Sequence, residues 1–163
     1  MEFSQRKPNR LPCYNYNQNG YYHITLCTNK KQCLLGKILP GDTFLPPSIK
    51  LSPSGRIAGK YILGIQDAYK DVLVDKYCIM PNHIHLMLCI QSDTGSDTTR
   101  QNEKIPLLIS AFKRLSAKEI GFSIWQRGYY DHIIRNEQDY LTTWRYIDDN
   151  PAKWIYDDYY ISG

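Results

Sequence analysis

Two apolar segments joined by a very short link constrain the fold more than any other feature of this sequence. Residues 71–80 (DVLVDKYCIM) and 83–90 (HIHLMLCI) are rich in the β-branched, aromatic and aliphatic residues that favour strands. Only Pro81 and Asn82 separate them. Because a two-residue link joins neighbouring antiparallel strands, the segment predicts a β-hairpin. We therefore expect an antiparallel sheet built around it.

Turn residues and hydrophobic periodicity place further elements on either side of this hairpin. The predicted elements are, in order, a strand at 20–28, one or two short strands at 36–52, a helix at 54–70, the hairpin, a helix at 105–121, a short strand and turn at 122–134, and a helix at 137–149. Ser52 or Ser54 and Asn136 are the expected N-caps, Gly121 is an expected C-cap, and Asn150-Pro151 is the expected end of the last helix.

This order of elements favours a two-layer α+β sandwich with a mostly antiparallel sheet. A length of 163 residues is enough to bury a core without disulfides or metal, and we expect one domain covering 1–163. Residues 1–12 are predicted to form a basic N-terminal arm. The polar residues 91–104 are predicted to form a mobile loop.

Composition and charge bear on the partner and the compartment. The net charge is +4, Lys and Arg gather in segments such as SQRKPNR and FKRLSAKEI, and the chain has 14 tyrosines. Basic patches with aromatic side chains suit phosphates and unpaired bases, although on charge alone a solvated surface is the commoner explanation. Five cysteines without a C-x-x-C pair, and no apolar run near the roughly 18 residues of a membrane span, predict a cytoplasmic protein without a membrane partner.

His83 and His85 are the first candidates for chemistry. Residues i and i+2 of a strand point to the same face, so their imidazoles lie side by side and can share one divalent metal ion. The alternative is a merely polar strand face. The other two histidines, His23 and His132, are interpreted as structural.

Tyr146 and Asn150 are the second candidates, because four residues in a helix bring both side chains to one face. Taken alone, Tyr146 is a packing residue. Beside a metal it has a role, since a phenol with an ordinary pKa of about 10 is a poor nucleophile without a cation that polarises the phosphate it attacks. Attack on a phosphodiester would give a covalent phosphotyrosine, and the strand could be rejoined to another 3′-OH.

The motifs YCIMPNHIHLML, FKRLSAKEI and WQRGYYDHIIRNEQDY followed by WRYIDDNPAKW occur in an order and spacing that resemble the REP-associated tyrosine transposases. These are relatives of the insertion-sequence transposases of the HUH single-tyrosine class. The resemblance covers most of the chain. It implies a ferredoxin-like sandwich, with a central antiparallel sheet of four or five strands and helices mainly on one face.

The resemblance also implies roles for individual residues. His83 and His85 would bind Mg²⁺ or Mn²⁺, Asn150 would complete the metal site, and Tyr146 would be the nucleophile. The implied substrate is single-stranded DNA at the foot of imperfect hairpins, and the implied assembly is a monomer or a homodimer. From charge and placement, the candidate phosphate contacts are Arg10, Lys113, Arg114, Arg127 and Arg135.

Three functions remain open from the sequence. The leading one is a metal-dependent DNA strand transferase that passes through a 5′-phosphotyrosine. The second is a metal-dependent nuclease that activates water, in which Tyr146 is structural. The third is a DNA-hairpin-binding protein that does not cut.

Overall fold

The structure is a computed structural model that describes residues 19–91 and 104–161. The predicted basic arm, with Arg10, lies outside the described residues. So does the predicted loop 91–104 apart from its two ends. Lys104, at the far end of that loop, is already the first residue of a helix.

The centre of the fold is a four-stranded antiparallel sheet in the order β4-β5-β1-β6. Its strands are β1 (Gly20–Cys27), β4 (Val72–Ile79), β5 (His83–Ile90) and β6 (Tyr130–Ile134). The predicted hairpin is confirmed as β4 and β5, and β1 pairs with β5 along its whole length. With helices between β1 and β4 and between β5 and β6, this is the expected α+β sandwich of ferredoxin-like type.

The alternation of side chains along the central strands separates the core from the opposite face. Even-numbered residues of β1 and β5, Leu26 and Leu86 among them, join the main hydrophobic cluster with residues of α1 (Pro53–Leu63) and α3 (Lys104–Ile120). Odd-numbered residues, including both His83 and His85, point to the other face. All eight residues of β5 are nevertheless buried, so the second face is covered as well.

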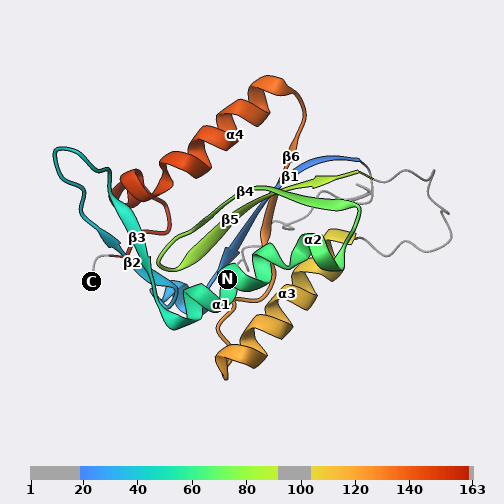
Figure 1. The fold of residues 1–163 in the computed structure, drawn as a ribbon, viewed down its shortest axis with the longest axis horizontal. Helices are drawn as coiled ribbons and strands as arrows, with labels where there is room; N and C mark the ends of the chain where they lie inside the picture. The colour runs from blue at the N-terminus through green and yellow to red at the C-terminus, as the bar shows by residue number, and fades with distance from the viewer. Residues whose placement is uncertain (1–18, 92–103, 162–163) are drawn as a thin grey trace, which may run out of the picture.

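Helix α4 (Glu137–Asp149) supplies that cover. The resemblance implied helices mainly on one face, and α1, the short α2 (Ile65–Ala68) and α3 do lie together, but α4 crosses the opposite side of the sheet (Figure 1). Its side chains reach the odd-numbered residues, with the rings of Tyr140 and Tyr21 centred 5.0 Å apart. This placement brings the last helix over the histidines. None of the described helices has the length and apolar character needed to cross a membrane.

The helix ends follow the predicted capping residues, with two differences. Ser52 Oγ accepts from Gly55 N at 3.0 Å, and Asn136 Oδ1 accepts from Asp139 N at 2.9 Å. The predicted helix 54–70 is interrupted at Gly64, between α1 and α2. Pro151 does not end the helical path either, because it lies in the first turn of a 3-10 helix, η2 (Asn150–Tyr156). Backbone N–H groups in a first turn have no partner within the helix, so a proline is tolerated there.

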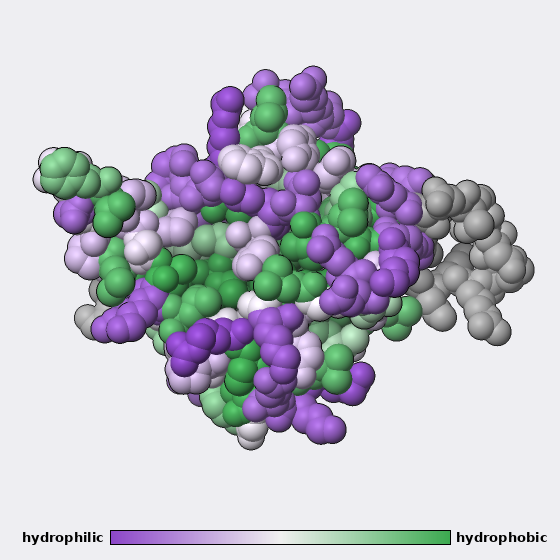
Figure 2. Space-filling view, in the orientation of Figure 1, coloured by the Kyte–Doolittle hydropathy of each residue, from purple (hydrophilic) through white to green (hydrophobic). Residues whose placement is uncertain are grey.

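The proline-rich segment forms a separate two-stranded arm, β2 (Gly36–Leu39) paired with β3 (Ser48–Leu51). Asp42 fixes the loop at its tip, because its Oδ1 accepts from the backbone N–H groups of both Phe44 and Leu45 at 2.8 Å. Phe44 is 91% exposed, and Figure 2 shows the resulting apolar surface at the end of the arm.

Gly55 and Gly59 of α1 give a matched test of this packing. A Cβ on Gly55 would lie 2.0 Å from the carbonyl oxygen of Leu35, which is held by the N–H of Ser52, whereas a Cβ on Gly59 would meet only Ile79 Cδ1 at 3.4 Å. We expect Gly55→Ala to lower the free energy of unfolding by about 1–3 kcal/mol and Gly59→Ala to raise it by up to about 1 kcal/mol. Urea denaturation checks both; equal effects would contradict this packing.

Candidate active site

All four histidines of the chain lie on the sheet face that α4 covers. His83 and His85 come from β5. His23, on β1, is the cross-strand partner of His132 on β6, and Thr25 beside it is the partner of His85. The histidines therefore run in a row across three strands, from the buried centre of the sheet to its edge.

Asn82 fixes the orientation of His83. Its Nδ2 donates to the backbone carbonyls of Lys31 at 3.0 Å and Tyr159 at 2.7 Å, so its Oδ1 faces the imidazole, 2.8 Å from His83 Nδ1. An amide oxygen only accepts, so Nδ1 of His83 carries the hydrogen and Nε2 has a free lone pair. A hydrogen bond on the far ring nitrogen fixes the tautomer and orientation that a histidine needs to bind metal. Sequence reasoning read Asn82 only as a turn residue, although it stands directly before His83.

His85 can present its Nε2 in the same way. Its Nδ1 lies 3.1 Å from His23 Nε2 and 3.2 Å from Thr25 Oγ1, both of which can accept a hydrogen. The Nε2 atoms of His83 and His85 are 3.0 Å apart. Metal–ligand bonds of about 2.1 Å at near-right angles bring neighbouring ligand atoms to about this separation. The pair thus fits one shared ion.

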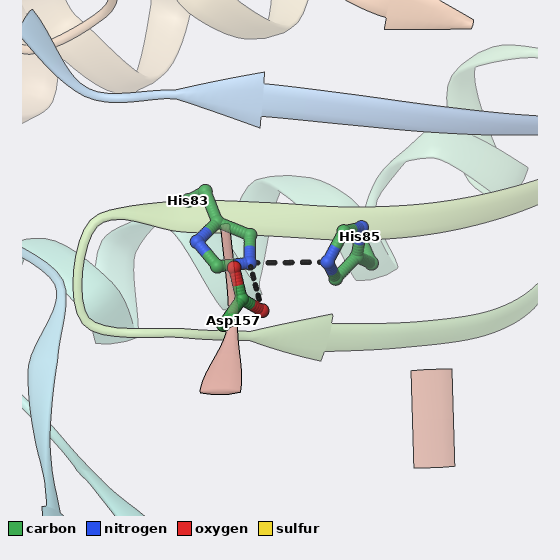
Figure 3. Close-up of side chains that lie close together, drawn as sticks. All are labelled: His83, His85 and Asp157. Carbon is green, nitrogen blue, oxygen red and sulfur yellow. Dashed lines mark hydrogen bonds and ion pairs between the residues drawn. The ribbon is translucent and has the colours of Figure 1, made fainter. Parts of the chain in front are cut away.

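A carboxylate completes the group. Asp157, the residue after η2, has Oδ2 at 3.7 Å from His83 Nε2, and the ligand atoms of His83, His85 and Asp157 lie within 4.8 Å of one another. Figure 3 shows these side chains converging. The three residues could hold a metal ion. Asp157 was not a candidate from sequence, because nothing in the pattern DDYYISG singles out one aspartate.

The predicted ligand Asn150 is also buried, at 2% exposure, and its Oδ1 has no hydrogen-bond partner among the described residues. A buried amide oxygen without a partner is unfavourable unless something else pairs with it, and a cation would do so. Its side chain lies close enough to Tyr146, four residues earlier on α4, to act on the pKa of that phenol, so the two predicted residues do meet.

Tyr146 lies over the histidines and remains open to solvent. Its ring centre is 5.1 Å from that of His85 and 6.1 Å from that of His23, and the residue is 44% exposed. Burial, and then the charge of Asp157, raises the pKa of Tyr146, while the hydrogen bond from Asn150 works against that rise. Near neutral pH the side chain is a protonated phenol, accessible to a large substrate.

Burial keeps the inner histidines neutral. It lowers the pKa of His83 to about 3 and that of His23 to about 4, with His132 adding to the second shift, and it places the pKa of His85 well below its ordinary value. The contact between His83 and Asp157 is therefore no ion pair at neutral pH. A neutral imidazole is the form that binds a metal.

The basic residues chosen from the sequence are in different surroundings. Arg127 lies with Thr25 and Cys27 around a small hollow on the histidine face. Lys113 is half-buried, and its ammonium donates to the backbone carbonyls of Gln126 and Gly128, while burial lowers its pKa to about 8. Arg114 and Arg135 are exposed.

Two proteins of Haemophilus influenzae are similar to this chain in sequence. No family model matches it. It is 31% identical to an uncharacterized protein of Haemophilus influenzae over 96% of this chain and 93% of that protein. A second H. influenzae protein, named as a candidate REP-associated tyrosine transposase, is 29% identical over 48% of this chain and 49% of its own length.

The fold is shared with a solved structure. A REP-associated tyrosine transposase bound to a REP hairpin aligns with a TM-score of 0.59 over 83% of this chain and 68% of that one, at 18% identity. The predicted fold class is confirmed by this likeness together with the observed sheet.

The buried histidines predict a pH-dependent stability of the metal-free protein. The unfolded chain takes up protons below its histidine pKa of about 6.5, whereas His83 and His23 stay neutral in the folded protein until pH 3–4. We expect the free energy of unfolding to fall from pH 6.5 to pH 5, by about 1.4 kcal/mol per pH unit for each such histidine.

Urea denaturation at several pH values within this range measures the slope. His23→Leu removes one of the titrating groups, so its slope should be shallower by about one proton. A slope equal to that of the unsubstituted protein would contradict the buried, neutral state of His23.

Proposed function

We propose that this chain, which is similar to REP-associated tyrosine transposases in sequence and in fold, cleaves single-stranded DNA at hairpin-associated sites through Tyr146 and rejoins it. The observation that carries the proposal is the contact of Tyr146, from α4, with the ring of His85, whose Nε2 is paired with that of His83 on β5. A packing tyrosine has no need of such neighbours, and the exposure of Tyr146 leaves room for DNA.

His83, His85 and Asp157 would hold Mg²⁺ or Mn²⁺, and the orphaned Oδ1 of Asn150 offers a further oxygen ligand. Two neutral nitrogens with one or two oxygens suit these ions when the remaining positions go to water or phosphate. When bound, the ion would polarise the scissile phosphate and stabilise the negative charge that develops on it.

Tyr146 would supply the nucleophilic oxygen. Its Oη forms a bond to the scissile phosphorus, its proton passes to solvent, and the bond between phosphorus and the 3′-oxygen of the upstream nucleotide breaks. That oxygen takes up a proton and leaves as a 3′-OH, while the downstream strand stays attached as a 5′-phosphotyrosine. Attack by another 3′-OH reverses these changes and rejoins the strand. Asn150, which lies next to the phenol and acts on its pKa, would orient it for this attack.

Arg127 is the basic residue best placed to contact the DNA backbone, because it lies beside Thr25 on the histidine face. Lys113 would act indirectly: its hydrogen bonds to the carbonyls of Gln126 and Gly128 hold the backbone that carries Arg127. Arg114 and Arg135 would add long-range attraction to phosphates, which weakens as salt concentration rises.

Substitution of the nucleophile tests the proposal. We expect the protein to form a covalent adduct with labelled single-stranded DNA that carries an imperfect hairpin, in the presence of Mn²⁺. Tyr146→Phe should abolish the adduct, because it removes the attacking oxygen. Tyr156→Phe is the matched control, since Tyr156 is 82% exposed and follows α4 by only a few residues. A denaturing gel resolves the adduct.

Two other results on the same gel would contradict strand transfer by Tyr146. Cleavage without an adduct that survives Tyr146→Phe means that water is the nucleophile and the protein is a nuclease. Tight binding of the hairpin without any cleavage means that the protein binds DNA without cutting it.

Asp157 and Asp158 give a matched pair for the metal site. We expect Asp157→Asn to weaken Mn²⁺ binding about tenfold or more, because it removes the negative charge but keeps an oxygen that can accept from the N–H of Tyr159. Asp158→Asn should leave the affinity unchanged, since Asp158 is exposed and not in the group. Isothermal titration calorimetry measures both; equal affinities for the two variants would exclude Asp157 as a ligand.

A further inference from the structure

We propose that His23 is a positioning residue for the metal site: it accepts the hydrogen on His85 Nδ1 and so holds His85 Nε2 toward the ion. The inference rests on the proposed metal-dependent function. It concerns a residue of β1 that sequence reasoning interpreted as structural and that is not itself in the His83, His85 and Asp157 group.

The argument starts from the two forms of a neutral imidazole. A histidine that binds metal through Nε2 must carry its hydrogen on Nδ1. In the other form His85 would carry the hydrogen on Nε2 and donate it to His83 Nε2, 3.0 Å away, which blocks both nitrogens at once. The site therefore needs an acceptor at His85 Nδ1 that favours the first form.

Two atoms compete for that role. His23 Nε2 is 3.1 Å from His85 Nδ1, and Thr25 Oγ1 is 3.2 Å away. A neutral imidazole nitrogen is the stronger acceptor of the two, and it has no hydrogen to donate back when His23 carries its own on Nδ1. A threonine hydroxyl can rotate and donate to His85 Nδ1 instead, which would favour the wrong form. His23 is thus the partner that favours the form of His85 with its hydrogen on Nδ1.

The surroundings of His23 keep it in place. Its ring centre is 6.1 Å from that of Tyr146, in an edge-on arrangement, and 5.1 Å from that of His85, so it packs against both the candidate nucleophile and a candidate ligand. Its neighbour across the sheet, His132, has its Nε2 2.8 Å from a carboxylate oxygen of Asp139, and is held at the sheet edge. His132 thereby ties the strand next to His23 to the first turn of α4.

The direct test is nitrogen-15 NMR on the full-length protein saturated with Mg²⁺. A hydrogen bond from His85 Nδ1 to His23 Nε2 gives a measurable N–N coupling across the bond, and a hydrogen bond to Thr25 gives none. We expect the coupling. Its absence, with the His85 Nδ1 hydrogen observed, would overturn the inference in favour of Thr25.

Substitutions test the same point by affinity. His23→Leu should weaken Mn²⁺ binding by about tenfold or more, and His23→Gln should stay within about threefold of the unsubstituted protein, because a glutamine amide places an acceptor near the position of Nε2. Thr25→Val should have the smaller effect. A large loss in Thr25→Val with none in His23→Leu would contradict the inference, and His23→Gln keeps the test valid if the leucine variant unfolds.

These readouts separate the inference from the proposed function. If the protein binds Mn²⁺ with this dependence on His23 but forms no adduct with DNA, the strand-transfer proposal fails and the role of His23 stands. If an adduct forms with equal efficiency and equal Mn²⁺ affinity in His23→Leu, the role of His23 fails and the strand-transfer proposal stands.

Discussion

The burial of β5 on both faces is the constraint on which the rest of the structure depends. Its even-numbered side chains fill the core beneath α1 and α3, and its odd-numbered side chains lie on the face that is covered by α4 and by the segment after it. A strand alternates its side chains with a period of two, so any shift that moved the histidines would also remove the core residues from their places. The candidate metal site therefore depends on the stability of the whole sheet.

Hydrogen bonds then fix the orientation and the tautomer of His83. Asn82 ties His83 to the carbonyls of Lys31 and Tyr159, so that the start of β5, the turn after β1 and the segment after η2 meet at one amide. The same segment carries Asp157. Because the histidines are neutral and Tyr146 is protonated near neutral pH, the proposed chemistry would need a cation to polarise the phosphate.

Periodicity and turn residues were sufficient to predict most of the fold. The hairpin around Pro81 and Asn82, the N-cap at Asn136 and the C-terminal positions of Tyr146 and Asn150 on one helical turn all depend on local sequence, and the structure contains each of them. The side of the sheet on which α4 lies could not be predicted from local sequence. The expectation of helices mainly on one face holds for α1, α2 and α3, but it did not say on which face the last helix lies.

The parts of the site that the sequence did not reveal come from long-range contacts. Asp157 is one of several aspartates near the C-terminus, and only the path of η2 selects it. His23 is separated from His85 by sixty-two positions, and their contact follows from the register of β1 against β5. Lys113 was predicted from its charge to contact DNA, but in the structure its ammonium donates to a backbone carbonyl of the same chain.

The central claim is that the sheet and the segment after η2 together form one metal site beside Tyr146. Crystals soaked in Mn²⁺ and measured near the manganese absorption edge test it most directly. The account predicts one anomalous difference peak bonded to Nε2 of His83, Nε2 of His85 and a carboxylate oxygen of Asp157. A strong peak elsewhere, or none at these atoms at a Mn²⁺ concentration that saturates binding in solution, would contradict it.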